Sequence, residues 1–155
     1  MTDRSRARET LRRKSPASFN VSGKVALLSF FLRQDLQFLS VKIVIYQKPT
    51  CTTCRQVYAA LKASGVDFEA VDYYLDPIPK AKLRDLLGKM GMKPRDLLRT
   101  KEAAYKELKL GERELSDSDL IDVMVEHPDL IQRPIVEKGT RAVLARPVER
   151  LKEIL

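Results

Sequence analysis

The pattern of apolar and polar residues from residue 41 onward predicts strands that alternate with helices. Residues 41–46 are almost continuously apolar and rich in β-branched side chains, which is typical of a central strand buried on both faces. A helical pattern follows over residues 52–63 and ends at Ser64-Gly65, and residues 68–74 alternate as a second strand. Because a helix connects the two strands, we expect them to pair in parallel.

The rest of the chain predicts a block of helices and then a hairpin. The helical segments are residues 80–90, 94–98, 102–108 and 116–126. Two short strands, 135–137 and 142–144, flank a Lys-Gly-Thr turn, and a last helix runs from Pro147 to Leu155. The order β-α-β, helical block, β-β-α predicts an α/β fold with a thioredoxin-like (glutaredoxin-like) mixed sheet and an all-helical insertion.

Residues 1–40 have a different pattern from the domain predicted for residues 41–155. Residues 2–18 are Arg-rich and polar without a hydrophobic period, which predicts disorder. The apolar run at 25–32 is shorter than the about 20 residues that a bilayer requires, and no signal-peptide cleavage site follows it. We expect a disordered or weakly helical extension and no membrane association. Our preferred hypothesis is that the natural start is Val41.

Composition and charge limit the classes of function. The chain has 155 residues, of which 44% are hydrophobic and 32% charged, as in ordinary soluble globular proteins. Its net charge of +8 is uneven, because residues 1–40 hold eight basic and three acidic side chains, whereas residues 41–155 hold twenty-one and eighteen. The predicted domain is therefore nearly balanced, and we expect no direct nucleic-acid partner.

The strongest candidate chemistry is the pair Cys51 and Cys54, the only cysteines in the chain, at the junction of the first strand and first helix. The pKa of a thiol falls when its sulfur lies at a helix start or beside cations, and Lys48 and Arg55 flank the pair. The two cysteines are one helical turn apart, so a disulfide between them can form and open with little backbone movement. This spacing predicts a nucleophilic or redox-active thiol.

Two other interpretations of the pair are less favoured. Structural zinc requires four Cys or His ligands, and the chain has two cysteines and the single His127, so we expect no metal site. An inert structural pair is the second alternative, against which the strand-then-helix context argues. Two thiols without a disulfide framework elsewhere favour a reducing, cytoplasmic compartment.

Four segments carry a resemblance to a known family. They are residues 46–55 (YQKPTCTTCR), 94–99 (PRDLLR), 122–128 (DVMVEHP) and 131–136 (IQRPIV). Through these motifs the chain, from about residue 41 to 155, resembles the arsenate reductase family of the thioredoxin-like fold. That family includes glutaredoxin-coupled arsenate reductases, Spx-type redox regulators and thiol reductases.

The resemblance implies an oxidoreductase in which the Cys51 thiolate attacks arsenate, and a second thiol releases arsenite from the resulting thioarsenate ester. It implies that Arg99, Arg133 and Arg146 bind the oxyanion and that Pro134 is a structural cis-proline. Arginine suits this role because its guanidinium donates two parallel hydrogen bonds and stays protonated. It also implies no tightly bound cofactor, with glutathione and glutaredoxin, or thioredoxin, as electron donor and partner.

Two positions depart from the family pattern. Gln47-Lys48 stand where many family reductases have a histidine-asparagine pair, so Lys48 is a candidate electrostatic substitute for that histidine. Cys54 stands where many of those enzymes have serine. It could resolve the Cys51 intermediate as a disulfide, or it could serve as a redox switch.

The alternatives are an Spx-type regulator that binds RNA polymerase and a thiol reductase with another substrate. Arg99 and Arg146 favour a reductase, because a regulator does not need an oxyanion cradle. We expect a monomer, since the domain has no long apolar heptad pattern. His127 is expected to cap a helix, and Tyr73-Tyr74 to be sheet and core residues.

Overall fold

The computed structural model describes residues 41–155, and the predictions for residues 1–40 lie outside this part of the chain. The strands are β1 (Ile43–Gln47), β2 (Phe68–Asp72), β3 (Ile135–Lys138) and β4 (Arg141–Leu144). The α-helices are α2 (Thr52–Ala63), α3 (Lys80–Met90), α4 (Ala103–Glu107) and α5 (Asp117–Glu126). Short 3-10 helices occupy η1 (Pro94–Leu97), η2 (Pro128–Leu130) and η3 (Val148–Glu153).

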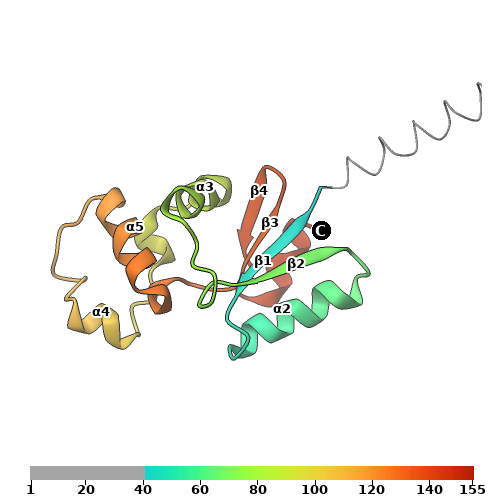
Figure 1. Cartoon of the computed structure of the whole chain (residues 1–155), viewed down its shortest axis with the longest axis horizontal. Coiled ribbons are helices and arrows are strands. Elements are labelled where there is room, and N and C mark those ends of the chain that lie inside the picture. The colour runs from blue at the N-terminus through green and yellow to red at the C-terminus, as the bar shows by residue number, and fades with distance from the viewer. Residues whose placement is uncertain (1–40) are drawn as a thin grey trace, which may run out of the picture. The chain divides into compact units, whose positions relative to one another are not determined.

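The strands form one mixed sheet in the order β2-β1-β3-β4. Strand β1 pairs in parallel with β2 and antiparallel with β3, which continues as a hairpin into β4. The predicted mixed sheet, with its helical block between β2 and β3, is confirmed. In Figure 1, α2 lies along the sheet, and α3, α4 and α5 gather at the other end of the described part.

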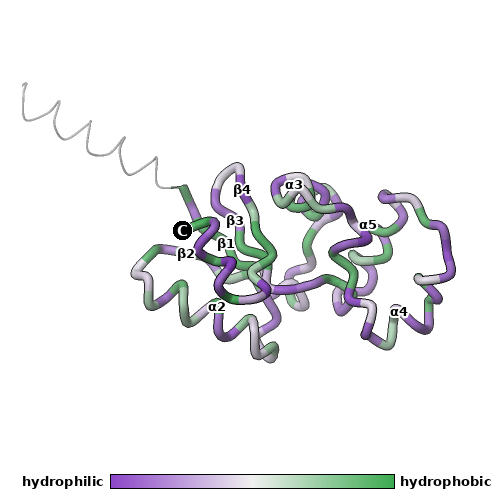
Figure 2. The backbone as a smooth tube through the Cα atoms, turned by 180° about the vertical axis from the view of Figure 1, so that it is seen from behind, coloured by the Kyte–Doolittle hydropathy of each residue, from purple (hydrophilic) through white to green (hydrophobic). Residues whose placement is uncertain are grey.

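The apolar run of β1 is buried on both faces because alternate residues enter two different cores. Ile43 and Ile45 pack into the core beneath α2 and η3, which also contains Val57 and Leu61 of α2. Tyr46 belongs to the second core, which is formed with the helical block. Figure 2 shows α2 alternating between apolar and polar residues, as expected of a helix with one face on the first of these cores.

Strand β2 is shorter than predicted, because Tyr73 and Tyr74 lie beyond its end at Asp72. The Asp72 side chain accepts a hydrogen bond from the Tyr74 amide at 3.1 Å, and its carbonyl accepts from the amides of Leu75 and Asp76. A side chain that bonds the backbone two residues on is a turn signal that competes with strand pairing. The prediction that these tyrosines belong to the sheet was wrong, although Tyr73 is buried in the core.

The last helix also differs from the prediction, since η3 is a 3-10 helix over Val148–Glu153 and not an α-helix to Leu155. Its backbone makes three-residue bonds, such as Arg150 N–H to the Pro147 carbonyl. The segment predicted as helix at 94–98 is likewise the short 3-10 helix η1. Both begin beside a proline, where the chain lacks an amide donor.

A buried carboxylate joins the sheet to α3. Glu137 of β3 is 6% exposed and accepts hydrogen bonds from Tyr46 Oη at 3.0 Å, Lys82 Nζ at 2.7 Å and Lys89 Nζ at 2.6 Å. Burial alone would raise the pKa of Glu137, but these donors outweigh burial and the pKa is lowered. The carboxylate is thus fully hydrogen-bonded within the fold.

Candidate active site

Cys51 is the residue that caps the amino end of α2, directly after the loop that leaves β1. Its carbonyl accepts the first helical hydrogen bond from the Arg55 amide at 3.0 Å, and its own amide bonds the Lys48 carbonyl at 2.9 Å. The neutral thiol makes no capping hydrogen bond of its own. Free backbone N–H groups at the start of α2 therefore surround a sulfur that is only partly exposed.

The surroundings of Cys51 stabilise its thiolate. Burial alone would raise the pKa of Cys51, but the backbone N–H of Cys54, the thiol of Cys54, the N–H of Thr53 and the charge of Arg133 outweigh it. The pKa of Cys51 is therefore lowered, as at the helix-start cysteines of thiol enzymes. This supplies a nucleophile at a lower pH than an ordinary cysteine would.

Cys54 is the opposite kind of thiol. Its side chain is fully buried in the first turn of α2, and burial is the largest cause that raises its pKa to about 12. The nearby Cys51 sulfur raises it further, because two thiolates side by side would repel. Both cysteines are free, so the pair is a reduced dithiol with one reactive and one protonated member.

Arg133 lies buried beside the cysteines, in the segment that leads into β3. Its side chain is 8% exposed, and its Nη1 donates hydrogen bonds to Tyr74 Oη at 3.2 Å, Tyr73 Oη at 3.4 Å and the Asp129 carbonyl at 3.4 Å. Its Nε is also buried and has no hydrogen-bond partner among the described residues. A buried donor without a partner is costly unless a ligand completes it.

The Asp129 carboxylate links Arg133 to Lys48. It accepts a hydrogen bond from Tyr74 Oη and one from Lys48 Nζ at 3.2 Å, and it lies 3.9 Å from Arg133 Nη2. Lys48 Nζ also lies 3.9 Å from the centre of the Tyr74 ring. Lys48 is thus engaged with Asp129 and Tyr74, and the charge that lowers the pKa of Cys51 is that of Arg133.

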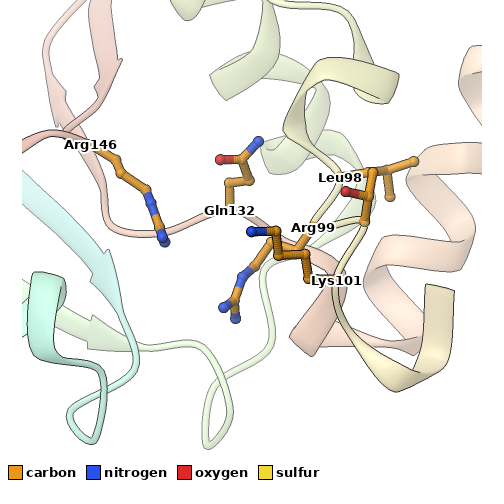
Figure 3. A pocket seen from close by; sticks show the side chains of 6 residues that line it. Leu98, Arg99, Lys101, Gln132 and Arg146 are labelled. Atoms are coloured by element: carbon orange, nitrogen blue, oxygen red, sulfur yellow. The ribbon is translucent and has the colours of Figure 1, made fainter. Parts of the chain in front are cut away.

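Arg99 and Arg146 line one cavity of about 210 Å³, together with Leu98, Thr100, Lys101 and Gln132. Figure 3 shows Arg99 and Arg146 entering this space from different segments, with Lys101 directed into it as well. Arg99 Nη1 lies 2.7 Å from Glu102 Oε1, but none of its N–H groups is aimed well enough at that oxygen to form a hydrogen bond. The cavity therefore offers cationic donors to an anion.

Arg146 connects this cavity with the start of α2. It also lines a second, open cavity with Thr53 and Gln56, residues of the first turns of α2. Arg133 and the cysteines do not line the Arg99 cavity. The structure thus has two neighbouring groups of candidate residues, one formed by Cys51, Cys54 and Arg133 and the other by Arg99 and Arg146.

The Arg133–Pro134 peptide bond is cis. The Arg146–Pro147 bond, which was not predicted to be cis, is cis as well. No group of three or more His, Cys, Asp or Glu side chains in residues 41–155 could hold a metal ion. None of the helices described here is long and apolar enough to cross a membrane. His127 ends α5, where its amide bonds the Val123 carbonyl at 2.9 Å.

The sequence analysis missed the environment of Arg133. Tyr74 and Asp129 both contact this arginine, and neither stood out as a functional residue. One signal was available, since β1 and β2 are parallel and their carboxyl ends must share an edge. Cys51 follows β1 and Tyr73-Tyr74 follow β2, so the tyrosines had to lie at the same edge as the thiol.

A helix-start thiolate beside a buried thiol and a buried arginine, on a mixed four-stranded sheet, defines the class of thioredoxin-like thiol oxidoreductases. A comparison with known protein families identifies one family within this class. Residues 46–154 match the model of the ArsC family, so the chain belongs to that family.

Individual relatives agree with the family match. The chain is 39% identical over 113 residues to an arsenate reductase of Escherichia coli (strain K12), covering 73% of this chain and 80% of that one. It is 42% identical over 118 residues to the uncharacterized protein YfgD of the same organism, covering 76% of this chain and 99% of that protein. It also resembles the solved structure of an arsenate reductase from Vibrio cholerae, with a TM-score of 0.70 and 39% identity over 75% of this chain and 99% of that one.

The family and the fold establish the protein as an enzyme, an oxidoreductase of the arsenate reductase type. The resemblance seen in the four sequence motifs is confirmed by these matches.

Proposed function

We propose that this protein reduces arsenate to arsenite with Cys51 as the nucleophile. The observation that carries the proposal is the environment of Cys51, a thiol of lowered pKa at the start of α2 beside a buried thiol and a buried arginine. Relatives named arsenate reductase support arsenate as the substrate. Arsenate is an anion, so a thiolate can approach it only where fixed cations offset the repulsion.

In the first step the Cys51 thiolate attacks arsenic and forms an S–As bond, while a hydroxyl group of the arsenate takes up a proton from solvent, breaks its As–O bond and leaves as water. The product is a thioarsenate ester in which arsenic is still in the +5 state. Arg99, Arg133 and Arg146 donate hydrogen bonds to its oxygens. The buried Arg133 Nε, which has no partner within residues 41–155, is one donor that an oxyanion would complete.

In the second step Cys54 resolves the ester. Its sulfur attacks the Cys51 sulfur, the S–As bond breaks, and the electron pair of that bond reduces arsenic to the +3 state. The Cys54 proton passes to an arsenite oxygen, so the products are arsenite and a Cys51–Cys54 disulfide. The contact between the Cys54 thiol and the Cys51 sulfur supports this role, because little movement is needed.

A second dithiol or two molecules of a thiol must then reduce the disulfide. Glutaredoxin with glutathione, or thioredoxin, is the reductant that we propose, since each acts by thiol–disulfide exchange. A dithiol that must be reduced in every cycle suits a reducing compartment such as the cytoplasm. Neither donor leaves a cofactor on the enzyme.

The test is arsenate-dependent NADPH oxidation by the purified chain, supplied in parallel with glutathione plus glutaredoxin and with thioredoxin plus its reductase. Wild type is compared with the Cys51→Ser and Cys54→Ser variants. We expect turnover with at least one system, its complete loss in Cys51→Ser, and a strong loss in Cys54→Ser with thioredoxin. Full activity of Cys51→Ser would contradict the assignment of the nucleophile.

A wild-type protein that forms the disulfide but turns over no arsenate would refute the choice of substrate. That result would favour a thiol reductase with another substrate or a redox-switched regulator. Direct measurement of arsenite by chromatography distinguishes true turnover from oxidation of NADPH by other routes.

A further inference from the structure

We propose that Tyr74 and Asp129 are positioning residues, which hold the Arg133 guanidinium beside the cysteine pair. The inference rests on the proposed function only in taking Cys51 as the reacting thiol. Tyr74 and Asp129 take no direct part in the steps proposed for Cys51 and Cys54.

The contacts within the cluster are directional. Arg133 Nη1 donates to Tyr74 Oη at 3.2 Å, and Tyr74 Oη in turn donates to the Asp129 carboxylate. The same Nη1 lies 3.4 Å from the Asp129 carbonyl, and Nη2 lies 3.9 Å from the Asp129 carboxylate. The Tyr74 hydroxyl therefore uses its lone pair for Arg133 and its proton for Asp129, and replacing it breaks both links.

Because Arg133 is buried, the position of its guanidinium strongly affects the Cys51 thiolate. Arg133 is 6% exposed, so its charge acts through a medium of lower effective dielectric than water. A buried guanidinium that loses its partners moves toward water or toward another acceptor. Since Arg133 favours the thiolate of Cys51, a shift of the guanidinium away from the sulfur weakens that stabilisation.

Several charged or titratable groups surround Arg133. They are Tyr73 and Tyr74 after β2, Asp129 in η2, Cys51 and Cys54 at the start of α2, Lys48, which contacts Asp129 and Tyr74, and Arg99, whose charge acts on Tyr74. Asp129 is the only carboxylate among them. Its direct effect on a nearby thiolate is repulsion, whereas its effect through Arg133 is stabilisation.

These two effects of Asp129 have opposite signs, which makes the inference testable. Removing the carboxylate by Asp129→Asn would lower the pKa of Cys51 if the direct charge dominated. The same change would raise that pKa if the main effect is release of Arg133. Tyr74→Phe changes no charge at neutral pH, so any effect it has on Cys51 must act through position.

The experiment is the pH profile of Cys51 alkylation by iodoacetamide on the full-length reduced chain, with the label located by fragment-ion mass spectrometry. We expect Tyr74→Phe to raise the pKa of Cys51 by about half a unit, which is about a threefold lower rate at pH values below that pKa. Asp129→Asn should shift the pKa in the same direction. Thermal unfolding checks that each variant is folded.

Matched controls make the same chemical changes elsewhere. Tyr58→Phe removes a hydroxyl from an exposed ring on α2. Asp122→Asn breaks the ion pair between Asp122 of α5 and Lys80 of α3. Neither should move the profile. A Tyr74→Phe shift no larger than that of Tyr58→Phe, or a downward shift in Asp129→Asn, would overturn the inference.

A double-mutant cycle tests whether Tyr74 acts through Arg133. In an Arg133→Ala background the inference predicts that Tyr74→Phe adds no further shift, since the group it positions is gone. An equal shift in both backgrounds would show a direct effect and refute the positioning role. Because the assay contains no arsenate, its outcome does not depend on whether arsenate is the substrate.

Discussion

Two buried charges of this fold, Glu137 and Arg133, have opposite surroundings. Glu137 accepts hydrogen bonds from Tyr46, Lys82 and Lys89, which come from β1 and from α3. Arg133 shares one nitrogen among three acceptors and leaves Nε without a partner in residues 41–155. Both are less than a tenth exposed, yet only Arg133 lies beside the cysteines.

The fold itself supplies hydrogen-bond partners to Glu137, whereas we propose that a ligand completes the bonding of Arg133. A buried group whose bonding capacity is filled by the fold contributes to stability, and it has nothing left to offer a ligand. A buried group with a free donor, next to a thiol of altered pKa, marks a site where a ligand completes the bonding. Burial alone would not distinguish the two residues.

Replacing Arg133 should change the activity more than any other substitution considered for these two charges. Arg133→Ala should lower kcat/KM for arsenate by about 100-fold, because it removes an oxyanion donor and a charge that favours the Cys51 thiolate. Steady-state kinetics check this at saturating reductant. Arg150→Ala, on η3, is the matched control and should leave kcat/KM within about twofold.

Glu137→Gln tests whether Glu137 contributes to stability and not to activity. It should lower the free energy of unfolding by about 2 kcal/mol, since Lys82 and Lys89 lose the buried one of their two carboxylate partners and keep only Asp85, and an amide cannot accept from every donor. Urea denaturation measures the loss. The activity per folded molecule should change by less than about twofold, and a drop as large as that of Arg133→Ala would contradict the distinction.

The free energy of unfolding should also depend on pH through the Glu137 carboxylate. The pKa of Glu137 in the fold is lowered from 4.5, so the unfolded chain binds more protons in this range. The stabilisation is therefore complete above about pH 5 and is lost as the pH falls through the folded pKa. Unfolding free energies from pH 7 to pH 3 should decline less steeply in Glu137→Gln than in wild type. Equal slopes would contradict this assignment.

The weakest effect on stability is expected for Lys82, one of the three donors to Glu137. Lys82→Gln should reduce stability by less than about 1 kcal/mol, because the Lys82 side chain is 31% exposed and Lys89 still binds Glu137. Thermal unfolding beside Glu137→Gln gives the ratio of the two effects. A loss as large as that of Glu137→Gln would mean that the lysines do not share the carboxylate.

The sequence predicted the sheet and its helices well because their periodicity is local. Strand β1 shows its burial on both faces as a continuous apolar run, and α2 agrees with its predicted bounds, Thr52–Ala63. The ends of β2 and η3 were less predictable. Strand β2 ends where the side chain and carbonyl of Asp72 accept hydrogen bonds that form a turn, and the 3-10 helix η3 follows Pro147, which has no amide donor.

The candidate site was predictable only in part for the same reason. Cys51 and Cys54 are only three positions apart in the sequence, so their place at the start of a helix could be inferred directly. Two partners of Arg133, Tyr73 and Tyr74, come from a segment about 60 residues away, to which no local pattern connects it, and only Asp129 is near it in the sequence. The match of Glu137 with Lys82 and Lys89 was invisible because it spans α3 and β3.

The most direct test of the central claim is a single turnover without added reductant. Reduced protein in excess is mixed with arsenate and quenched in acid, and arsenite and the Cys51–Cys54 disulfide are quantified. We predict one arsenite for each disulfide in wild type, an arsenic adduct held on Cys51 in Cys54→Ser, and neither product in Cys51→Ser. Disulfide without arsenite, or unchanged arsenate in wild type, would contradict the account.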